Sequence, residues 1–230
     1  CRIQWQIREG NQGWTSSSIN EKNITEMKLS NNIHLGFYES NYNNLNLKLD
    51  YVAQKPYNKK AGVIELLNMI YRMGFSNLDE EKLVEFEQKN NIRMRVSLSP
   101  YSLKVSANSD SNSRDLILDN IKNLINEPRL TEENLEIVKK RIKDTINRFE
   151  KNEGYIYAEN YSELNPYEYS NKEIAENIDS VTLEDLKECH EYFIKNSRVV
   201  ASANLPKQQK EVIADEIKTS LEKLHNVLPN

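Results

Sequence analysis

Hydrophobic and polar residues alternate in several short stretches of this chain. In LNLKLDYVA (45–53), three leucines and a tyrosine occupy every second position, with polar residues between them. This period of two is typical of a half-buried β-strand. The preceding stretch HLGFYES (34–40) has the signals of another strand, and the intervening NYNN favours a turn. The pattern therefore predicts a β-hairpin across residues 34–53.

Two further regions show the same alternation. IRMRVSL (92–98) and SLKVSAN (102–108) are joined by Ser99-Pro100-Tyr101, which predicts a second hairpin. RVVASANL (198–205) predicts a last strand near the end of the chain.

The spacing of apolar residues changes to three and four in six other stretches, and that spacing indicates amphipathic helices. The predicted helices are 63–74, a short one containing Leu83 and Phe86, 116–125 ended near Pro128, 131–149, 182–196 and 211–224. Leu67 and Ile142 lie on the apolar stripes of their helices, so we expect both to be buried. Helices in blocks with two hairpins and a late strand predict an α+β fold, with a largely antiparallel sheet covered by helices.

The first 25 residues differ from the rest. They have no clean helical period and contain Gly10, Gly13 and three consecutive serines, which favours an extended segment and linker. We expect residues 1–25 to connect to a preceding domain and residues 26–230 to form one domain. Because the sequence starts at Cys1 rather than Met, we also expect it to be part of a longer chain.

Composition excludes several classes of protein. The formal net charge is -4, and Lys and Arg are scattered among Asp and Glu, so we expect neither nucleic-acid binding nor insertion into a membrane. Cys1 and Cys189 have no metal-type spacing, and we expect free thiols. We expect a soluble protein, either cytoplasmic or periplasmic in a bacterium.

Three segments, in this order, resemble the insulinase/pitrilysin-like (inverzincin) zinc metallopeptidases. MKLSNNIHLGFYES is similar to the family's opening strands, and INEPRLTEENLEIVKKRI to the segment that leads into its long helix. ENIDSVTLEDLKECHEYFIKNSRVVASANLP is similar to a later helix and the strand after it. The resemblance covers residues 26 to 228 and implies a metallopeptidase-domain fold of the processing-peptidase type.

The family's catalytic motif is altered in this chain. Active domains carry H-x-x-E-H on the first helix, where two His bind Zn²⁺ and the Glu acts as general base on a metal-bound water. The matching positions here are Glu65, Asn68 and Met69, and the further acidic ligand would fall near Asp144 and Thr145. We therefore expect no catalytic residue, no metal site and no cofactor in this segment, with zinc held by the catalytic domain of the parent.

The resemblance implies a non-catalytic domain, most similar to the third domain of a long bacterial member. Such a domain would help to form a closed chamber and bind substrate, while the parent chain carries out zinc-dependent proteolysis. Its partners would be other domains of that chain and a peptide substrate. The alternative is a free-standing interaction or scaffold protein on the same fold, without protease activity.

A few other residues are candidates for function. Tyr155, Tyr157, Tyr161 and Tyr167 are candidate contacts for a peptide in the chamber, although aromatic clusters more often pack in cores. Glu65 is expected to be solvated or ion-paired on the polar face of its helix. His190 shares a helix face with Leu186 and Phe193, so we expect a packed histidine rather than a ligand.

Overall fold

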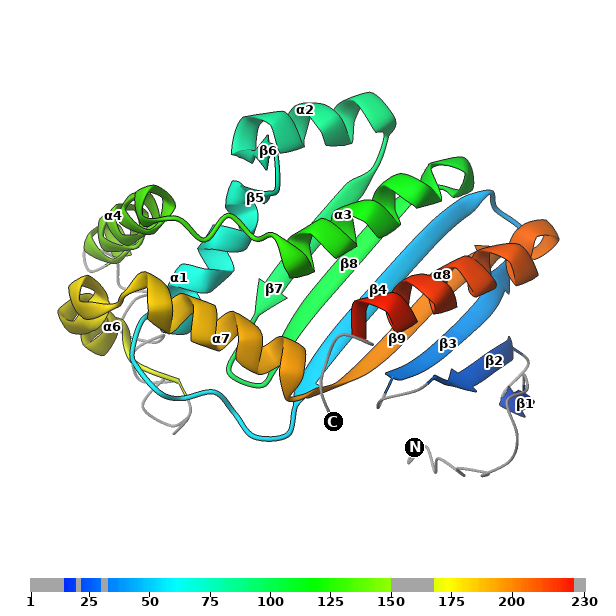
Figure 1. Cartoon of the computed structure of the whole chain (residues 1–230), viewed down its shortest axis with the longest axis horizontal. Helices are drawn as coiled ribbons and strands as arrows, with labels where there is room; N and C mark the ends of the chain where they lie inside the picture. The colour runs from blue at the N-terminus through cyan, green and yellow to red at the C-terminus, as the bar shows by residue number, and fades with distance from the viewer. Residues whose placement is uncertain (1–14, 20–21, 30–32, 150–167, 226–230) are drawn as a thin grey trace.

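The computed structural model describes residues 15–19, 22–29, 33–149 and 168–225, and within these ranges a seven-stranded sheet carries helices on one face (Figure 1). The strands of the sheet are β1 (Thr15–Ile19), β2 (Lys22–Lys28), β3 (Ile33–Ser40), β4 (Asn44–Ala53), β7 (Arg93–Leu98), β8 (Ser102–Asp110) and β9 (Ser197–Pro206). The short strands β5 (Gly74–Phe75) and β6 (Leu78–Asp79) pair separately.

The described α-helices are α1 (Val63–Ile70), α2 (Glu80–Asn90), α3 (Arg114–Asn126), α4 (Glu132–Phe149), α6 (Asn171–Asn177), α7 (Leu183–Lys195) and α8 (Lys210–His225). Six of them follow the predicted stretches, and α6 is an additional one. Thr182 and Asp185 form the capping box that starts α7, because each side chain bonds the backbone N–H of the other residue. None of the helices in the described ranges is long and apolar enough to cross a membrane.

The strand order is β1-β2-β3-β9-β4-β8-β7. Every neighbouring pair is antiparallel except β3 and β9, which run parallel. The predicted α+β class, with a largely antiparallel sheet, is therefore confirmed. The predicted hairpin of β7 and β8 is also confirmed.

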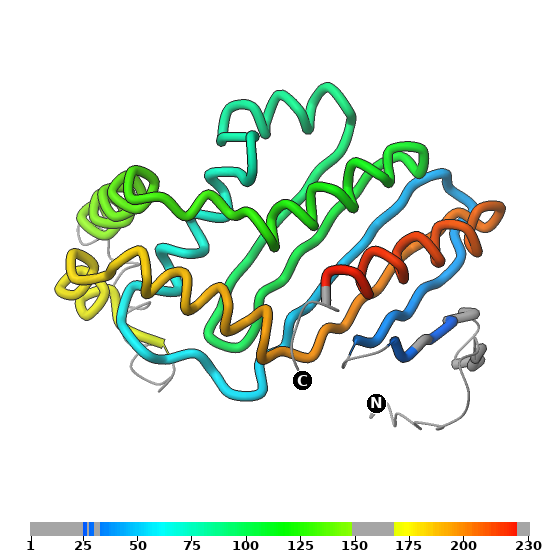
Figure 2. The backbone as a smooth tube through the Cα atoms, in the orientation of Figure 1, coloured from blue at the N-terminus to red at the C-terminus, as the bar shows by residue number. Residues whose placement is uncertain are grey.

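The predicted hairpin of β3 and β4 is wrong. Strand β9 lies between them, as the tube in Figure 2 shows, and it pairs with both. Neighbouring strands are about 4.8 Å apart, so the short connection at residues 41–43 can span the gap that one inserted strand requires. The short turn between β3 and β4 in the sequence therefore does not make these two strands neighbours in the sheet.

The boundary expected after residue 25 falls inside β2. Residues 15–19 form β1 and pair with β2, which in turn pairs with β3. The sheet thus begins earlier in the chain than the expected linker allows. Residues 1–14 lie outside the described residues, and their connection to a preceding domain stays a prediction.

The core lies between the sheet and its helical layer. Helices α3, α7 and α8 lie over the strands, and α1 packs beside α4, α7 and β7 at one end (Figure 1). Leu67 and Ile142 are buried as predicted, with exposed fractions of 0% and 8%. Burying a leucine side chain stabilises a fold by about 1.5–3 kcal/mol, so the four fully buried side chains of α1 (Val63, Leu66, Leu67 and Ile70) anchor that helix firmly.

Candidate functional site

Helix α1 carries the positions at which the zinc motif was expected. It starts after Gly62, whose φ of +90° lies in the left-handed region that favours glycine. The buried side of the helix fixes the directions in which Glu65, Asn68 and Met69 point. All three side chains are partly buried, so each has a definite environment that can be compared with the chemistry of a metal site.

Asn68 has a structural hydrogen bond. Its Oδ1 accepts the backbone N–H of Leu98 at 3.0 Å, at the end of β7. In the expected motif this position holds the general base. An amide oxygen that already accepts a backbone N–H, on a side chain that cannot take up a proton near neutral pH, cannot perform that role.

Glu65 is partly buried, so the expectation of a carboxylate solvated on a polar helix face was wrong. Burial raises the pKa of its carboxyl group, and the charge of Glu168 raises it further. Among the described residues Glu65 has no ion pair. Its burial arises because α1 packs against α4, α7 and β7, so the polar side of the helix is partly covered as well.

The donors at these positions do not fit Zn²⁺. Zinc sites in proteins use thiolate, imidazole and carboxylate ligands, whereas α1 offers one carboxylate, one engaged amide and the thioether of Met69, which packs against the core. On α4, Asp144 and Thr145 are both exposed, and the Thr145 hydroxyl donates to the Arg141 carbonyl oxygen at 2.8 Å. We therefore derive no catalytic step through a metal.

Strand β7 is the edge of the sheet, next to α1. The backbone N–H of Met94 donates to Oε1 of Glu87 at 2.7 Å, as the N–H of Leu98 does to Asn68. Because backbone N–H groups alternate in direction along a strand, that of Val96 points the same way as these two. Side chains of the same chain thus occupy two of the three amide groups on this part of the edge, which limits the addition of another strand.

His190 belongs to a buried network, as expected of a packed histidine. Its Nε2 lies 2.8 Å from the carbonyl oxygen of Ile125, and its Nδ1 lies 2.7 Å from the hydroxyl of Tyr71. A carbonyl can only accept, so Nε2 carries the hydrogen and Nδ1 accepts from Tyr71. Burial lowers the pKa of His190 and raises that of the neighbouring Cys189 thiol. The network ties α7 to α3 and keeps both groups neutral.

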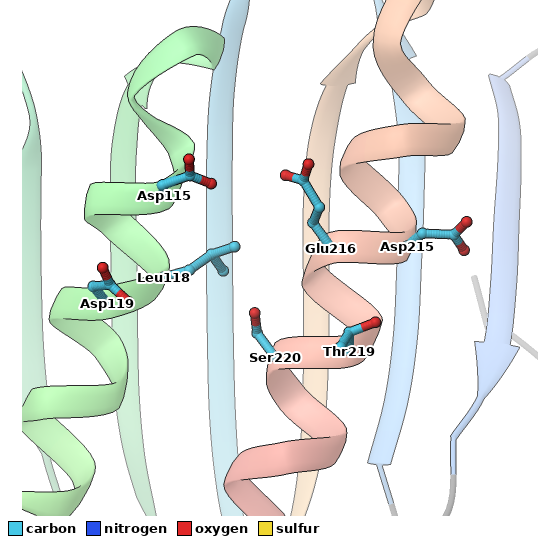
Figure 3. A pocket seen from close by; sticks show the side chains of 7 residues that line it. All are labelled: Asp115, Leu118, Asp119, Asp215, Glu216, Thr219 and Ser220. Carbon is cyan, nitrogen blue, oxygen red and sulfur yellow. The ribbon is translucent and has the colours of Figure 1, made fainter.

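Helices α3 and α8 border a cleft of about 530 Å³ (Figure 3). Four carboxylates line it, from Asp115, Asp119, Asp215 and Glu216. Glu216 is already bonded to the guanidinium of Arg114. In the described part of the chain, no three residues of the His, Cys, Asp and Glu types are placed to hold a metal ion. The cleft is therefore an acidic surface of the helical layer.

The other face of the sheet has the opposite charge. No described helix covers it, and its side chains come from the polar positions of the strands. We call this surface the open face. Among the side chains that the structure describes, six basic residues lie on it, against the carboxylates of Glu26, Asp50 and Asp110; the basic residues are Lys28, Lys48, Arg93, Arg95, Lys104 and Arg198. Sequence reasoning missed this grouping, although Lys and Arg at polar strand positions were the available signal.

The tyrosines at 155, 157, 161 and 167 lie outside the described residues. Their role as peptide contacts stays a prediction. Tyr169, just beyond them, packs partly against the core.

Solved structures share this arrangement over most of the chain. A peptidase M16 inactive domain from Pseudomonas fluorescens matches 86% of the chain with a TM-score of 0.68 and 17% identity. Pitrilysin matches 96% with a TM-score of 0.68 and 16% identity. The first half of the periplasmic protease PqqL from Escherichia coli matches 94% with a TM-score of 0.69 and 11% identity.

The chain has the fold of the M16, or insulinase/pitrilysin-like, peptidase domains. It spans about half the length of the Pseudomonas fluorescens and Escherichia coli chains (50% and 48%) and a quarter (25%) of pitrilysin. The sequence itself matches no protein-family model and no curated protein. The resemblance drawn from the order of sequence segments is therefore confirmed by the fold.

Proposed function

We propose that this chain is a non-catalytic domain of a larger zinc-dependent endopeptidase, and that it acts by packing and binding rather than by hydrolysis. The observation that carries this proposal is the hydrogen bond that the Asn68 side chain accepts from the backbone of Leu98. At the position of the general base, the side chain holds the end of β7 in place, and the neighbouring motif positions carry Glu65 and Met69. The helix keeps a structural role where its counterparts would carry the catalytic one.

The size of the related structures supports the same proposal. Each matched chain is two to four times longer than the segment it shares with this protein. The missing partners would be further domains of a parent chain, which together with this one would form a chamber around a peptide. Tyr155, Tyr157, Tyr161 and Tyr167 remain the proposed peptide contacts, and zinc would be bound by a different domain.

Metal content and peptide cleavage test the proposal directly. The purified chain, equilibrated with ZnSO₄ and freed of excess metal, should retain far less than one zinc per chain and cleave no peptide of a mixed library. Near-equimolar zinc, together with cleavage that a chelator abolishes, would contradict the proposal. Glu65→Gln is the matched control, because zinc that depended on α1 would be lost in this variant, whereas zinc bound elsewhere would remain.

The alternative, a free-standing scaffold on the same fold, makes a different prediction about the gene. An upstream H-x-x-E-H in the same reading frame would support the peptidase parent. A reading frame confined to this domain would favour the scaffold.

A further inference from the structure

The open face has uncompensated positive charge. On the helical side, nine ion pairs join Lys or Arg to a carboxylate, among them Lys60 with Asp185 at 2.7 Å and Arg141 with Glu80 at 2.9 Å. On the open face only Arg95 is paired, with Glu87 at 3.6 Å across the sheet edge. The remaining basic residues there have no ion pair with any described residue; they are Lys28, Lys48, Arg93, Lys104 and Arg198.

The strand register brings these cations together from distant parts of the sequence. Lys104 lies opposite Asp50 in the β8–β4 ladder, and Lys48 is two residues before Asp50 on the same strand. Val200 lies opposite Asp50 on the other side, in β9. Burial, followed by the charges of Arg198 and Lys28, lowers the pKa of His34 on β3. Positive charge therefore extends from β8 across the sheet to β3.

The centre of the open face is a groove of about 510 Å³ across β7, β8, β4 and β9. Its lining includes Lys48, Asp50, Arg95, Lys104 and Val200. One carboxylate oxygen of Asp50 is buried without a hydrogen-bond partner among the described residues. The same holds for the amide oxygen of Asn204, farther along β9 on the same face. Unpaired buried acceptors are costly, so both oxygens favour an additional donor. Because both oxygens are covered, a donor from a bound molecule reaches them only when the side chains that cover them move aside.

We propose that the open face binds an acidic peptide segment, laid across β8, β4 and β9 in extended form. This rests on the proposed function and names the chemistry of the peptide. Carboxylates of the peptide would pair with Lys48 and Lys104, and its backbone N–H groups would donate to Asp50 and Asn204. The exposed methyl groups of Val200 and Val52 would contact the methylene groups of the acidic side chains of the peptide.

A peptide fits this surface better than other anions. The backbone of a nucleic acid is a phosphodiester chain without N–H groups, so it would pair with the cations, and only the bases could donate to Asp50 and Asn204. A peptide supplies acceptors on its side chains and donors on its backbone. The chain as a whole has a net charge of -4, so the attraction is local to this face and weakens with salt.

The test uses fluorescein-labelled peptides of equal length and measures binding by fluorescence anisotropy. One alternates Glu with Gly, and the others carry Gln or Lys in place of Glu. The Glu peptide should bind the purified chain about tenfold more tightly than the Gln peptide. A few partly exposed ion pairs together contribute about 1.4 kcal/mol of binding free energy, which corresponds to this factor. Raising NaCl from about 50 mM to about 300 mM should remove most of this preference.

Two matched variants locate the binding surface. Lys48→Gln/Lys104→Gln removes two cations from the open face, whereas Lys122→Gln/Lys140→Gln removes two exposed cations from α3 and α4. Both change the net charge equally. The first should weaken binding of the Glu peptide about tenfold, and the second should leave it unchanged. Circular dichroism and thermal unfolding of each variant establish that it is folded.

Several outcomes would overturn the proposal. These are equal affinity for the Glu and Gln peptides, equal losses in both double variants, or a single-stranded oligonucleotide that binds the open face as tightly as the Glu peptide. Concentration-dependent self-association that blocks the peptide would assign the open face to a second copy of this chain instead. A chain that holds no zinc and shows no peptide preference would contradict this inference alone, whereas stoichiometric zinc with cleavage would contradict the proposed function.

Discussion

Charges on the two sides of the sheet are arranged in opposite ways. On the helical side, cations such as Arg114 and Lys210 are bonded to carboxylates of other elements of the same chain, Glu216 and Glu39. On the open face, Lys48 and Lys104 have no carboxylate partner among the described residues. On the helical side, cations therefore form ion pairs with carboxylates of the same chain. On the open face, Lys48 and Lys104 form no ion pair with any described residue.

The same contrast appears in the uncharged residues. Side chains of β4 that point to the helices, such as Leu47 and Tyr51, are at most 1% exposed. Those that point the other way, such as Val52, are 37% exposed. The difference teaches that the buried apolar side chains of β4 lie on the helical side, whereas its open-face side chains are more exposed. Changes on the helical side should therefore affect folding, and changes on the open face should affect binding.

The largest effect on folding is expected from Leu67→Ala in α1. Leu67 is fully buried, so its truncation should lower the free energy of unfolding by about 2–5 kcal/mol. Val200→Ala on the open face should lower it by less than about 1 kcal/mol, because Val200 is 36% exposed. Urea unfolding of both variants measures the difference. Equal losses would show that the open face is covered and that the contrast between the sides is wrong.

His190 should make folding sensitive to acid. Burial lowers its pKa in the folded state below the ordinary value of 6.5, so below about pH 6.5 the unfolded chain binds a proton that the folded chain excludes. The free energy of unfolding should therefore fall as the pH drops, by at most about 1.4 kcal/mol per pH unit from this group.

Urea unfolding at a series of pH values measures this effect. His190→Gln should flatten the dependence between pH 6.5 and 5, whereas His34→Gln on the open face should flatten it less, since His34 is only partly buried. If His34→Gln flattened the pH dependence of the unfolding free energy more than His190→Gln did, the expected difference between the buried side and the open face would be wrong.

Asn68→Ala tests the junction between α1 and the sheet edge. The variant leaves the Leu98 N–H without its acceptor, which should cost about 1–2 kcal/mol. Asn147→Ala, at an exposed position of α4, makes the same change in a helix without removing a hydrogen bond. Hydrogen exchange should show faster exchange of the Leu98 amide in Asn68→Ala alone. Unchanged exchange there would mean that Asn68 does not hold the edge.

Glu65→Gln should have the smallest effect, and it should be stabilising. Burial raises the pKa of Glu65 in the folded state, so its ionised form is less favourable there than in the unfolded chain. Near pH 7.5 the variant should be more stable by less than about 1 kcal/mol, and its advantage should shrink as the pH falls and the wild-type carboxyl is protonated. A loss of stability would instead indicate an ion pair at Glu65.

Local pattern identified most of the elements and the β7–β8 hairpin, but not the neighbours of β3 and β4. The alternation in 45–53 gives the strand and its buried side, because side chains alternate whatever strand lies beside it. It does not reveal that β9 enters between β3 and β4, because that depends on a ladder with residues more than 140 positions later. Helix caps such as Thr182 were predictable, since their bonds are local.

The site was harder to predict than the fold, for two physical reasons. The apolar stripe of α1 identified the buried side, but α1 packs against three other elements, so Glu65 is partly buried too. The cations at 48, 104 and 198 looked scattered because they are far apart in the sequence. Only the strand register places them on one surface.

The central position of β9 has a consequence for synthesis of the protein on the ribosome. Among the strands that the structure describes, β1 to β3 form one group, β4, β8 and β7 form another, and β9 joins the two. Because β9 comes after α7 in the chain, the two groups cannot become one sheet until nearly all of the domain has emerged. Contacts between such distant residues slow folding. The nascent chain should therefore carry two unpaired sheet edges for most of its translation, at β3 and at β4, and these are the places where chaperones would be needed.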